Sequence, residues 1–332
     1  MKTAIVILNW NGKALLEQFL PNVIEHSQTD DVNIYVADNA STDDSIVFIE
    51  QHHPEIKIIK NEKNYGFAGG YNQALKAIEE ELLVLLNSDI EVIANWLKPI
   101  LNAFKADSKL AIGQPKILSH KNKNYFEYAG AGGGFIDKYG FPYCRGRVFF
   151  DLEKDEGQYN DTIDILWATG ACLFIRNRIF KELNGFDEDY FAHHEEIDLC
   201  WRAFNKGLKI QYFGQATVYH VGGATLEAEN VYKTYLNFRN SLTSLVKNLP
   251  TKKLFPVLFI RLALDGVASF RFLTQGKIKH LFAVLGSHVY FYWYLFKNLK
   301  KRDTNQRDDY FKTKSIVWEY FVKKKKTYSE LE

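Results

Sequence analysis

The chain has 332 residues, of which 46% are hydrophobic and only 7 are proline. This length and composition predict one large folded domain with an appendage and argue against intrinsic disorder. The three cysteines are widely spaced and form no CxxC pair, which indicates a reducing compartment and neither a zinc site nor a disulfide framework. No secretory signal is visible before the first strand-like run, so we expect a cytoplasmic protein.

The net charge of +2 conceals an uneven distribution. Residues 277–332 carry 13 Lys or Arg against 6 Asp or Glu, so the rest of the chain is net acidic. These basic residues lie beside an aromatic, apolar stretch and not on the N-terminal half. This placement argues against a nucleic-acid-binding protein.

The first 90 residues alternate β-rich runs with helical ones. Strands are predicted over 3–8, 32–37, 56–60 and 82–86, with helices near 15–23, 41–53 and 67–78. Ser41 or Thr42 is expected to cap the second helix, and the third should begin at the flexible "GFAGG". This alternation predicts a Rossmann-like α/β sheet.

Polar clusters follow three of these strands, at Asn9–Gly12, Asp38–Ser41 and Asn87–Asp89. Each alone is more readily a turn, because Asn, Asp, Ser and Gly are the common turn formers. Parallel strands, however, place their carboxyl ends on one edge, where such sheets bind ligands. The coincidence therefore predicts a binding site. "GFAGG" lacks the G-x-G-x-x-G spacing and follows no first strand, which excludes a hydride-transfer enzyme.

The second half opens with Gly- and Tyr-rich loops and short strands, over 114–165, that we expect to shape the acceptor side. A strand is predicted over 172–176, and an amphipathic helix begins at Glu195 and Glu196. Acids in a first turn are also favoured by the helix dipole alone. Asp198 and Arg202, four residues apart, predict an ion pair.

Histidines supply further candidates for a metal site. His193 and His194 are one pair, although adjacent loop residues rarely both face one site. His220 is more suggestive, because it follows the strand "ATVY" and precedes Gly222 and Gly223, where the backbone can turn tightly around a bound group.

Eight motifs in this order resemble the family 2 glycosyltransferases, and within them the bacterial rhamnosyltransferase-like branch that builds cell-surface polysaccharides. The motifs are "VILNWNG", "VADNASTDDS", "NYGFAGGYNQAL", "LLNSD", "TGACLFIR", "GFDEDYFAHHEEIDLCWR", "VYHVGG" and "NFRNSL". The likeness covers about residues 3–248. It implies a GT-A fold over 1–249, with a nucleotide-sugar-binding half (1–113) and an acceptor-binding half (114–249).

The resemblance also implies the reaction and the donor site. A sugar, with rhamnose as one candidate, would pass with inversion from a dTDP- or UDP-linked donor to a hydroxyl of a glycan or lipid-linked glycan. The nucleoside pocket would be lined by Asn9, Trp10 and Asn11, the base bound by Asp38, and the donor flanked by Gly66 and Asn72.

The segment Asn87-Ser88-Asp89 stands where the family places its D-x-D metal motif. The resemblance makes Asp89 a ligand of Mg or Mn and His220 an imidazole ligand, with diphosphate and water oxygens completing the shell. Asn87 replaces the first acid of the motif, which weakens the expectation of a two-carboxylate site. The same resemblance places Glu196 in the position of the general base, with Glu195 or Asp198 as alternatives.

Residues 250–332 lie outside the resemblance. The stretch 281–296 has no formal charge and is rich in Tyr and Trp, but about 20 apolar residues are needed to span a bilayer. We expect a helical extension lying in the membrane interface, with its basic tail against anionic lipid on the inner face of the cell membrane. The alternative is a helical subdomain packed on the core or an oligomer contact.

Two other functions compete with glycosyl transfer. A nucleotidyltransferase can use a similar α/β domain but would not need an acid pair opening a helix after "GFDEDYF". A catalytically silent sugar-nucleotide-binding or scaffold protein is suggested only by the substitutions at Asn87 and Glu196.

Overall fold

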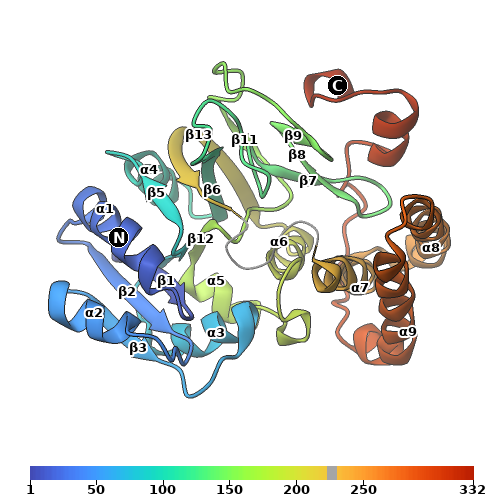
Figure 1. The fold of residues 1–332 in the computed structure, drawn as a ribbon. Helices are drawn as coiled ribbons and strands as arrows, with labels where there is room; N and C mark the ends of the chain where they lie inside the picture. The colour runs from blue at the N-terminus through green and yellow to red at the C-terminus, as the bar shows by residue number, and fades with distance from the viewer. Residues whose placement is uncertain (223–229) are drawn as a thin grey trace.

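A computed structural model describes residues 1–222 and 230–332 (Figure 1). Four parallel strands form its N-terminal half: β1 (Thr3–Asn9), β2 (Val32–Asp38), β3 (Lys57–Lys60) and β4 (Leu82–Asn87). They are joined by α1 (Lys13–Ser27), α2 (Ser45–His52) and α3 (Gly66–Ala74), which continues as a short 3₁₀ turn, η1 (Leu75–Ala77). The predicted Rossmann-like half is therefore confirmed.

Helices cover both faces of this sheet. Along β1, Ala4 and Val6 belong to the same core cluster as α3, whereas Ile5 and Ile7 belong to the cluster that includes α1. Alternate side chains of a strand point to opposite faces, so both faces of β1 are buried. This explains why the strand is continuously apolar in sequence.

The helix cap predicted for α2 was wrong. The helix begins at Ser45 with Asp44 in the cap position, and neither Ser41 nor Thr42 caps it. The Ser41 hydroxyl instead accepts hydrogen bonds from the Asn9 side chain (3.1 Å) and the Asn11 backbone (2.9 Å). The helix starts late because this loop is used to hold the end of β1.

The rest of the main sheet has both parallel and antiparallel strand pairs. Its strands are β5 (Ile90–Val92), β6 (Leu110–Ser119), β11 (Thr162–Asp164), β12 (Cys172–Arg176) and β13 (Lys209–His220). The helices along this part of the chain are α4 (Lys98–Ala106), α5 (Asn177–Glu182), η2 (Glu188–Tyr190) and α6 (Glu195–Asn205). The strand order is β11-β13-β6-β12-β4-β1-β2-β3, with β5 pairing on β13. Because β5 and β13 are antiparallel, His220 lies opposite Ile90, next to Asp89.

A second, four-stranded sheet is made by β7 (Gly134–Ile136), β8 (Pro142–Cys144), β9 (Arg147–Val148) and β10 (Asp151–Leu152). Short strands were expected in this region, although its first residues belong to the long strand β6. All three cysteines are buried and free.

Helix α7 (Val231–Asn248) precedes the predicted extension, which begins with α8 (Thr251–Thr274) and α9 (Ile278–Lys300). The chain then returns over the four-stranded sheet, with a π-helical turn, η3 (Trp318–Val322), and a 3₁₀ turn, η4 (Ser329–Leu331) (Figure 1). Ile316 donates its backbone N–H to the buried Asp137, and Tyr328 stacks on Phe135. In the described part of the chain, no helix has the length and apolar character to cross a bilayer.

Candidate active site

The three polar clusters meet at one edge of the sheet. In the parallel register Asn9 lies opposite Asp38, and Leu8 lies opposite Asn87. Strands β4, β1 and β2 are neighbours, so their carboxyl ends form a continuous polar rim. The convergence expected from the sequence is thus confirmed.

Asn9 and Asp38 form the buried centre of this rim. The Asn9 amide donates to Asp38 Oδ1 (3.3 Å), and Asp38 Oδ2 accepts the Ser41 backbone N–H (3.1 Å). Asn9 Oδ1 is buried without a hydrogen-bond partner. A Cβ atom on Gly12 would approach that oxygen to 2.5 Å, so the chain needs glycine there. The unpaired oxygen is a polar group available to a ligand.

The neighbouring loop leaves one aromatic ring open to solvent. Asn11 adopts a left-handed conformation (φ 51°), and its side-chain oxygen accepts the Thr42 backbone N–H (2.7 Å). Trp10, between these anchored residues, is 56% exposed. Ser88 faces the same loop, with its hydroxyl 3.9 Å from the position of a Cβ on Gly12.

Gly66 and Asn72 contact the loop that leads to the acid pair. Gly66 has φ 72°, and a Cβ there would lie 2.8 Å from the Phe191 ring. The Asn72 side chain donates to the Phe186 carbonyl (2.8 Å) and accepts the Phe186 N–H (2.9 Å). Both ends of this amide therefore hold the loop in place. Contact between Asn72 and the nucleotide-sugar donor stays a prediction.

Asp89 and His220 lie together, although 131 positions separate them in the sequence. His220 Nε2 is 3.2 Å from Asp89 Oδ1 and 3.4 Å from the Asn87 amide nitrogen. His220 Nδ1 lies 3.4 Å from Glu127 Oε2. A carboxylate behind an imidazole orients its other nitrogen, which is the arrangement often found around metal-binding histidines. Sequence reasoning missed Glu127, because its segment carries no motif.

The chemistry of these side chains fits a divalent cation. Burial acts to lower the pKa of His220, but Asp89 and Glu127 outweigh it and raise that pKa to about 10. Two buried carboxylates thus hold a positive charge between them. Within residues 1–222 and 230–332, no three His, Cys, Asp or Glu side chains form a ready-made metal site. A cation held by Asp89 and His220 would need further oxygen ligands from outside the protein.

The acid pair opens α6 with carboxylates that the protein leaves unpaired. Glu195 Oε2 and Glu196 Oε2 are both buried without a hydrogen-bond partner. Burial and the neighbouring Glu196 raise the pKa of Glu195 well above its usual range. Burial raises the pKa of Glu196 to about 7. Of the two, only Glu196 has a pKa placed near neutral pH.

Glu196 is linked to the polar rim through the start of β12. A Cβ on Gly170 would lie 3.9 Å from the Glu196 Cβ, so the two residues are neighbours. The next residue, Ala171, accepts the backbone N–H of Asn87 (3.0 Å). Glu196 and the Asn87–Asp89 segment thus contact two consecutive residues, Gly170 and Ala171, just before β12.

Two residues of α7 hold the strained loop before the acid pair. Phe191, His193 and His194 all have positive φ, between 63° and 71°. The Asn240 amide donates to the carbonyls of Tyr190, Ala192 and His193, and Arg239 donates to those of Asp189 and Tyr190. Such backbone strain persists only where the surroundings impose it. The motif "NFRNSL" includes Arg239 and Asn240, but the sequence did not indicate that they bind the backbone of this loop.

The two histidines of this loop are neutral. Burial lowers the pKa of His193 to about 4 and that of His194 to about 3. His193 Nε2 and His194 Nδ1 are buried without a partner. They contribute uncharged polar atoms next to the acid pair, and the structure gives them no carboxylate partner in the described residues.

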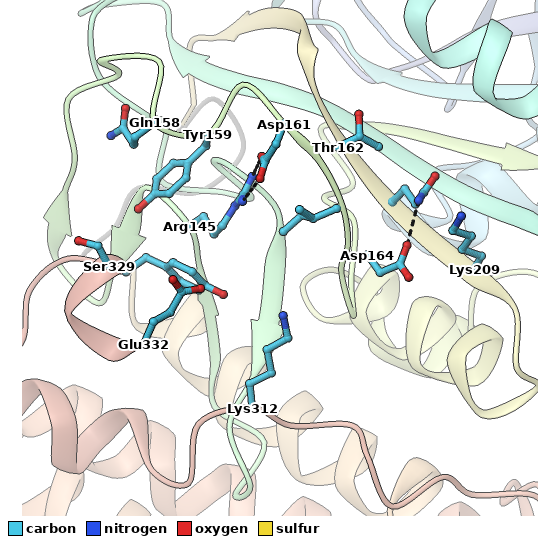
Figure 2. Close-up of a pocket in the computed structure, with 13 residues that line it drawn as sticks. Arg145, Gln158, Tyr159, Asp161, Thr162, Asp164, Lys209, Lys312, Ser329 and Glu332 are labelled. Atoms are coloured by element: carbon cyan, nitrogen blue, oxygen red, sulfur yellow. Dashed lines mark hydrogen bonds and ion pairs between the residues drawn. The ribbon is translucent and has the colours of Figure 1, made fainter.

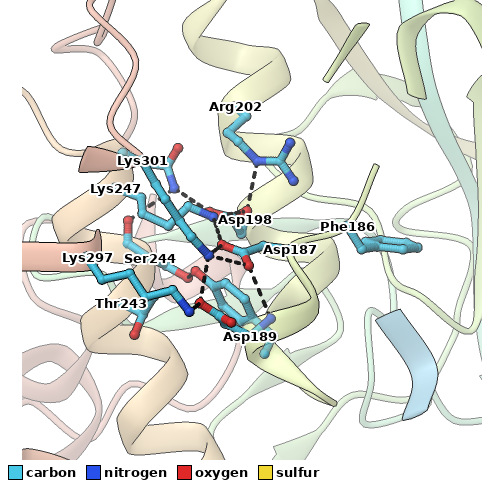
Figure 3. A network of polar contacts seen from close by, with 12 residues as sticks. Phe186, Asp187, Asp189, Asp198, Arg202, Thr243, Ser244, Lys247, Lys297 and Lys301 are labelled. Carbon is cyan, nitrogen blue, oxygen red and sulfur yellow. Dashed lines mark hydrogen bonds and ion pairs between the residues drawn. The ribbon is translucent and has the colours of Figure 1, made fainter. Parts of the chain in front are cut away.

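Asp198, the third candidate base, belongs to an ionic network behind α6 (Figure 3). Asp198 accepts hydrogen bonds from Arg202 (2.8 Å), Lys247 (2.8 Å) and Asn248 (2.9 Å), which confirms the predicted Asp198–Arg202 ion pair. Lys247 also bridges to Asp187 (2.8 Å). Burial is outweighed by these cations, so the pKa of Asp198 is lowered. An acid so fully committed is a poor base.

A polar pocket of about 650 Å³ lies elsewhere, between β11, the start of β13 and the last residues of the chain (Figure 2). Arg145 spans it with a two-pronged ion pair to Asp161 (2.6 and 3.0 Å). None of the site residues predicted from the sequence lines this pocket. It belongs to the junction of the tail with the sheets.

Comparison with known proteins decides the family. The model of glycosyl transferase family 2 matches residues 4–183, which is more than half of the chain. The chain belongs to glycosyl transferase family 2. It is a glycosyltransferase, and the resemblance to the rhamnosyltransferase-like branch is confirmed by relatives of that kind.

Two relatives illustrate the match. The low-salt glycan biosynthesis hexosyltransferase Agl10 of Haloferax volcanii is 21% identical over 288 residues, covering 84% of this chain and 87% of Agl10. The N-acetylglucosaminyl-diphospho-decaprenol L-rhamnosyltransferase of Mycobacterium tuberculosis is 22% identical over 231 residues, covering 65% of this chain and 75% of the relative.

Solved structures confirm the GT-A fold. S. aureus TarS 1-349 in complex with UDP-GlcNAc aligns with a TM-score of 0.57 at 16% identity, over 86% of this chain and 79% of TarS 1-349. The mannosyltransferase PcManGT from Pyrobaculum calidifontis, in complex with GDP-Man and Mn²⁺, aligns with a TM-score of 0.53 at 12% identity, over 88% of this chain and 75% of PcManGT.

Proposed function

We propose that this glycosyltransferase moves a sugar, with rhamnose as one candidate, from a dTDP- or UDP-linked donor to a glycan hydroxyl with inversion at the anomeric carbon. The observation that carries the proposal is the placement of Glu196. Its Cβ lies beside Gly170, the neighbour of Ala171, whose carbonyl accepts the backbone N–H of Asn87, and its Oε2 is buried without a partner. A base and a charge-binding pair thus flank one edge of the sheet.

The residues divide the work between them. The exposed Trp10 ring and the Asn9 oxygen face the nucleoside, and Asp38 binds the base. Glu196 accepts the proton of the acceptor hydroxyl as that oxygen attacks from the side opposite the diphosphate. Asp89 and His220 would hold Mg or Mn, which when bound would stabilise the negative charge of the departing diphosphate. PcManGT with its Mn²⁺ supports this assignment by fold alone.

The acceptor is proposed to be lipid-linked. The Mycobacterium tuberculosis relative is named for a decaprenol-bound acceptor, and such acceptors lie in a membrane. We therefore place the enzyme peripherally on the inner face of the cell membrane, attached through residues 250–332, where it extends a cell-surface polysaccharide.

Release of nucleoside diphosphate tests this function. The full chain should hydrolyse or transfer from a dTDP- or UDP-sugar with Mn²⁺, and Asp89→Ala should abolish turnover and make donor binding insensitive to Mn²⁺. A wild-type protein that never releases nucleoside diphosphate would indicate a silent binding protein. Release of inorganic diphosphate from a nucleoside triphosphate and a sugar phosphate would indicate a nucleotidyltransferase.

A further inference from the structure

Helices α8 and α9 bury charged side chains and expose apolar ones. The side of α8 that packs inward holds an ion pair, Arg261 with Asp265 (2.8 Å), to which His288 of α9 adds a contact at 3.2 Å. Both members of that pair are buried. The solvent-facing sides, by contrast, carry large apolar side chains. Exposing apolar surface while burying charge is the reverse of what a water-facing helix pair requires.

The apolar side chains form one stripe along each helix, which we call the outer surface. It comprises Phe255, Phe259, Ile260, Val267, Phe270 and Leu273 on α8, and Ile278, Phe282, Leu285, Val289, Tyr292, Trp293 and Phe296 on α9. Four of these aromatic rings, at Phe255, Phe259, Trp293 and Phe296, are at least 75% exposed. A continuous exposed surface of this kind marks an interaction site.

Charge identifies what covers the outer surface. Residues 251–302 contain ten Lys or Arg and a single acid, Asp265, which is buried and already paired. Basic residues stand at the helix ends, for example Lys252, Lys279 and Lys300, with the apolar stripe between them. A second copy of this chain would bring like charges together, whereas a bilayer with anionic headgroups neutralises them. Exposed Trp and Tyr also suit the headgroup level.

We infer that the outer surface of α8 and α9 is buried in the headgroup region of an anionic bilayer. Because each helix is apolar along one side only, it lies in the membrane surface. This inference rests on the proposed function in its lipid-linked acceptor. It keeps the helices expected from the sequence as the membrane contact and leaves out the basic tail. The tail is instead packed on the four-stranded sheet, where Tyr328 and Ile316 are buried.

Flotation of the full chain with vesicles tests the inference. The wild type should float with phosphatidylglycerol-containing vesicles. Phe259→Glu, Trp293→Glu and Phe296→Glu should each weaken partitioning about tenfold or more, because a large apolar side chain leaves the interface. Lys279→Glu with Lys300→Glu should reduce binding to the level seen with pure phosphatidylcholine. The matched control is Val47→Glu, which replaces an exposed apolar residue of α2, at the far side of the molecule (Figure 1).

The inference would be overturned if the three outer-surface variants floated with the vesicles as well as the wild type does. It would also be overturned if the wild type ignored vesicles and light scattering found a dimer that Trp293→Glu converts to a monomer, since a second copy would then cover the surface. Transfer to a water-soluble acceptor analogue should be equal in Trp293→Glu and the wild type. If the proposed function is wrong, neither the wild type nor Trp293→Glu will show transfer. Failure of the proposed function is thus distinguishable from failure of the membrane inference, which the flotation assay reports.

Discussion

Glu195 and Glu196 are adjacent, and their surroundings raise the pKa of both carboxyl groups. One oxygen of each is buried and unpaired, and two nearby carboxylates cannot both ionise easily in such a place. Burial and Glu196 raise the pKa of Glu195 well above its usual range, whereas burial raises the pKa of Glu196 to about 7. At the residue scale, this difference supports our proposal that Glu196 is the base.

Glu196→Gln should reduce transfer by about 10² to 10⁴ with little change in donor affinity, because it removes the base but not the donor site. Glu195→Gln should be milder, since a protonated carboxyl and an amide are similar. Turnover and donor binding measured in parallel on both variants check this. The opposite ordering would make Glu195 the base.

The rate of transfer should depend on the ionisation of Glu196. A base must be deprotonated, so kcat/KM should rise about tenfold per pH unit below pH 7 and level off above it. The rise should be absent from the residual activity of Glu196→Gln. A wild-type profile that is flat between pH 5 and 8 would contradict the assignment.

How much of the site was predictable differs between its residues. The rim of Asn9, Asp38 and Asp89 followed from sequence, because strand periodicity and parallel pairing place strand ends together. Glu127 did not, since its approach to His220 depends on the path of a loop between β6 and β7 that has no periodic pattern. The prediction that Ser41 caps α2 was wrong for a related reason. Capping preferences depend on local sequence alone, whereas the Ser41 hydroxyl is hydrogen-bonded to Asn9 and Asn11, about 30 residues earlier in the chain.

At the scale of elements, α7 is the part that holds the acid-bearing loop in place. The family resemblance gave "NFRNSL" as a motif, but only the structure shows that Arg239 and Asn240 cap the carbonyls of residues 189–193. The strand and helix segments of the first 90 residues were predicted to within a few residues. The long antiparallel return of β13 onto β5 was not, since pairing between distant strands leaves no local signal.

Asn240→Ala should lower kcat substantially and leave donor binding unchanged, because the carbonyls of Ala192 and His193 lose their side-chain donor and the loop can relax from its left-handed conformation. Asn237→Ala, on the same helix, is the control and should behave like the wild type. Turnover and donor titration distinguish the outcomes. Equal kcat in both variants would show that the loop is held by other contacts.

At the scale of the whole molecule, an ionic network joins the sheet domain to the extension (Figure 3). Lys297 of α9 contacts Asp189, and Lys301, just after α9, contacts both Asp187 and Asp189, which precede the strained loop. Lys247 of α7 lies between Asp187 and Asp198. The extension expected to begin at residue 250 is thus fastened to the loop of the active site. Truncation after Pro250 would remove part of this support along with any membrane contact.

Lys247→Met should lower the free energy of unfolding by about 3–5 kcal/mol at pH 7, because it takes one of two cations from the carboxylates of Asp187 and the buried Asp198. These ion pairs depress the pKa values of Asp187 and Asp198, so their contribution is present above the usual pKa of 3.8 and is lost as the pH falls below it. The deficit of the variant should therefore shrink in acid.

Denaturant unfolding at pH 7 and at successively lower pH measures this deficit. The exposed Lys105→Met on α4 is the control and should unfold like the wild type at every pH. A Lys247→Met protein whose deficit is the same in acid as at neutral pH would show that packing, and not charge, accounts for the loss.

The return of the tail over the four-stranded sheet has a consequence for how the protein is made. Tyr328, four residues from the end of the chain, is buried against Phe135 and Tyr143, near the middle of the sequence. Synthesis proceeds from the N-terminus, so these aromatic rings stay uncovered until Tyr328 has left the ribosome. A chain cut before Tyr328 would thus keep Asp89, Glu196 and His220 but leave these core aromatic rings uncovered, which makes it a target for chaperones and proteases.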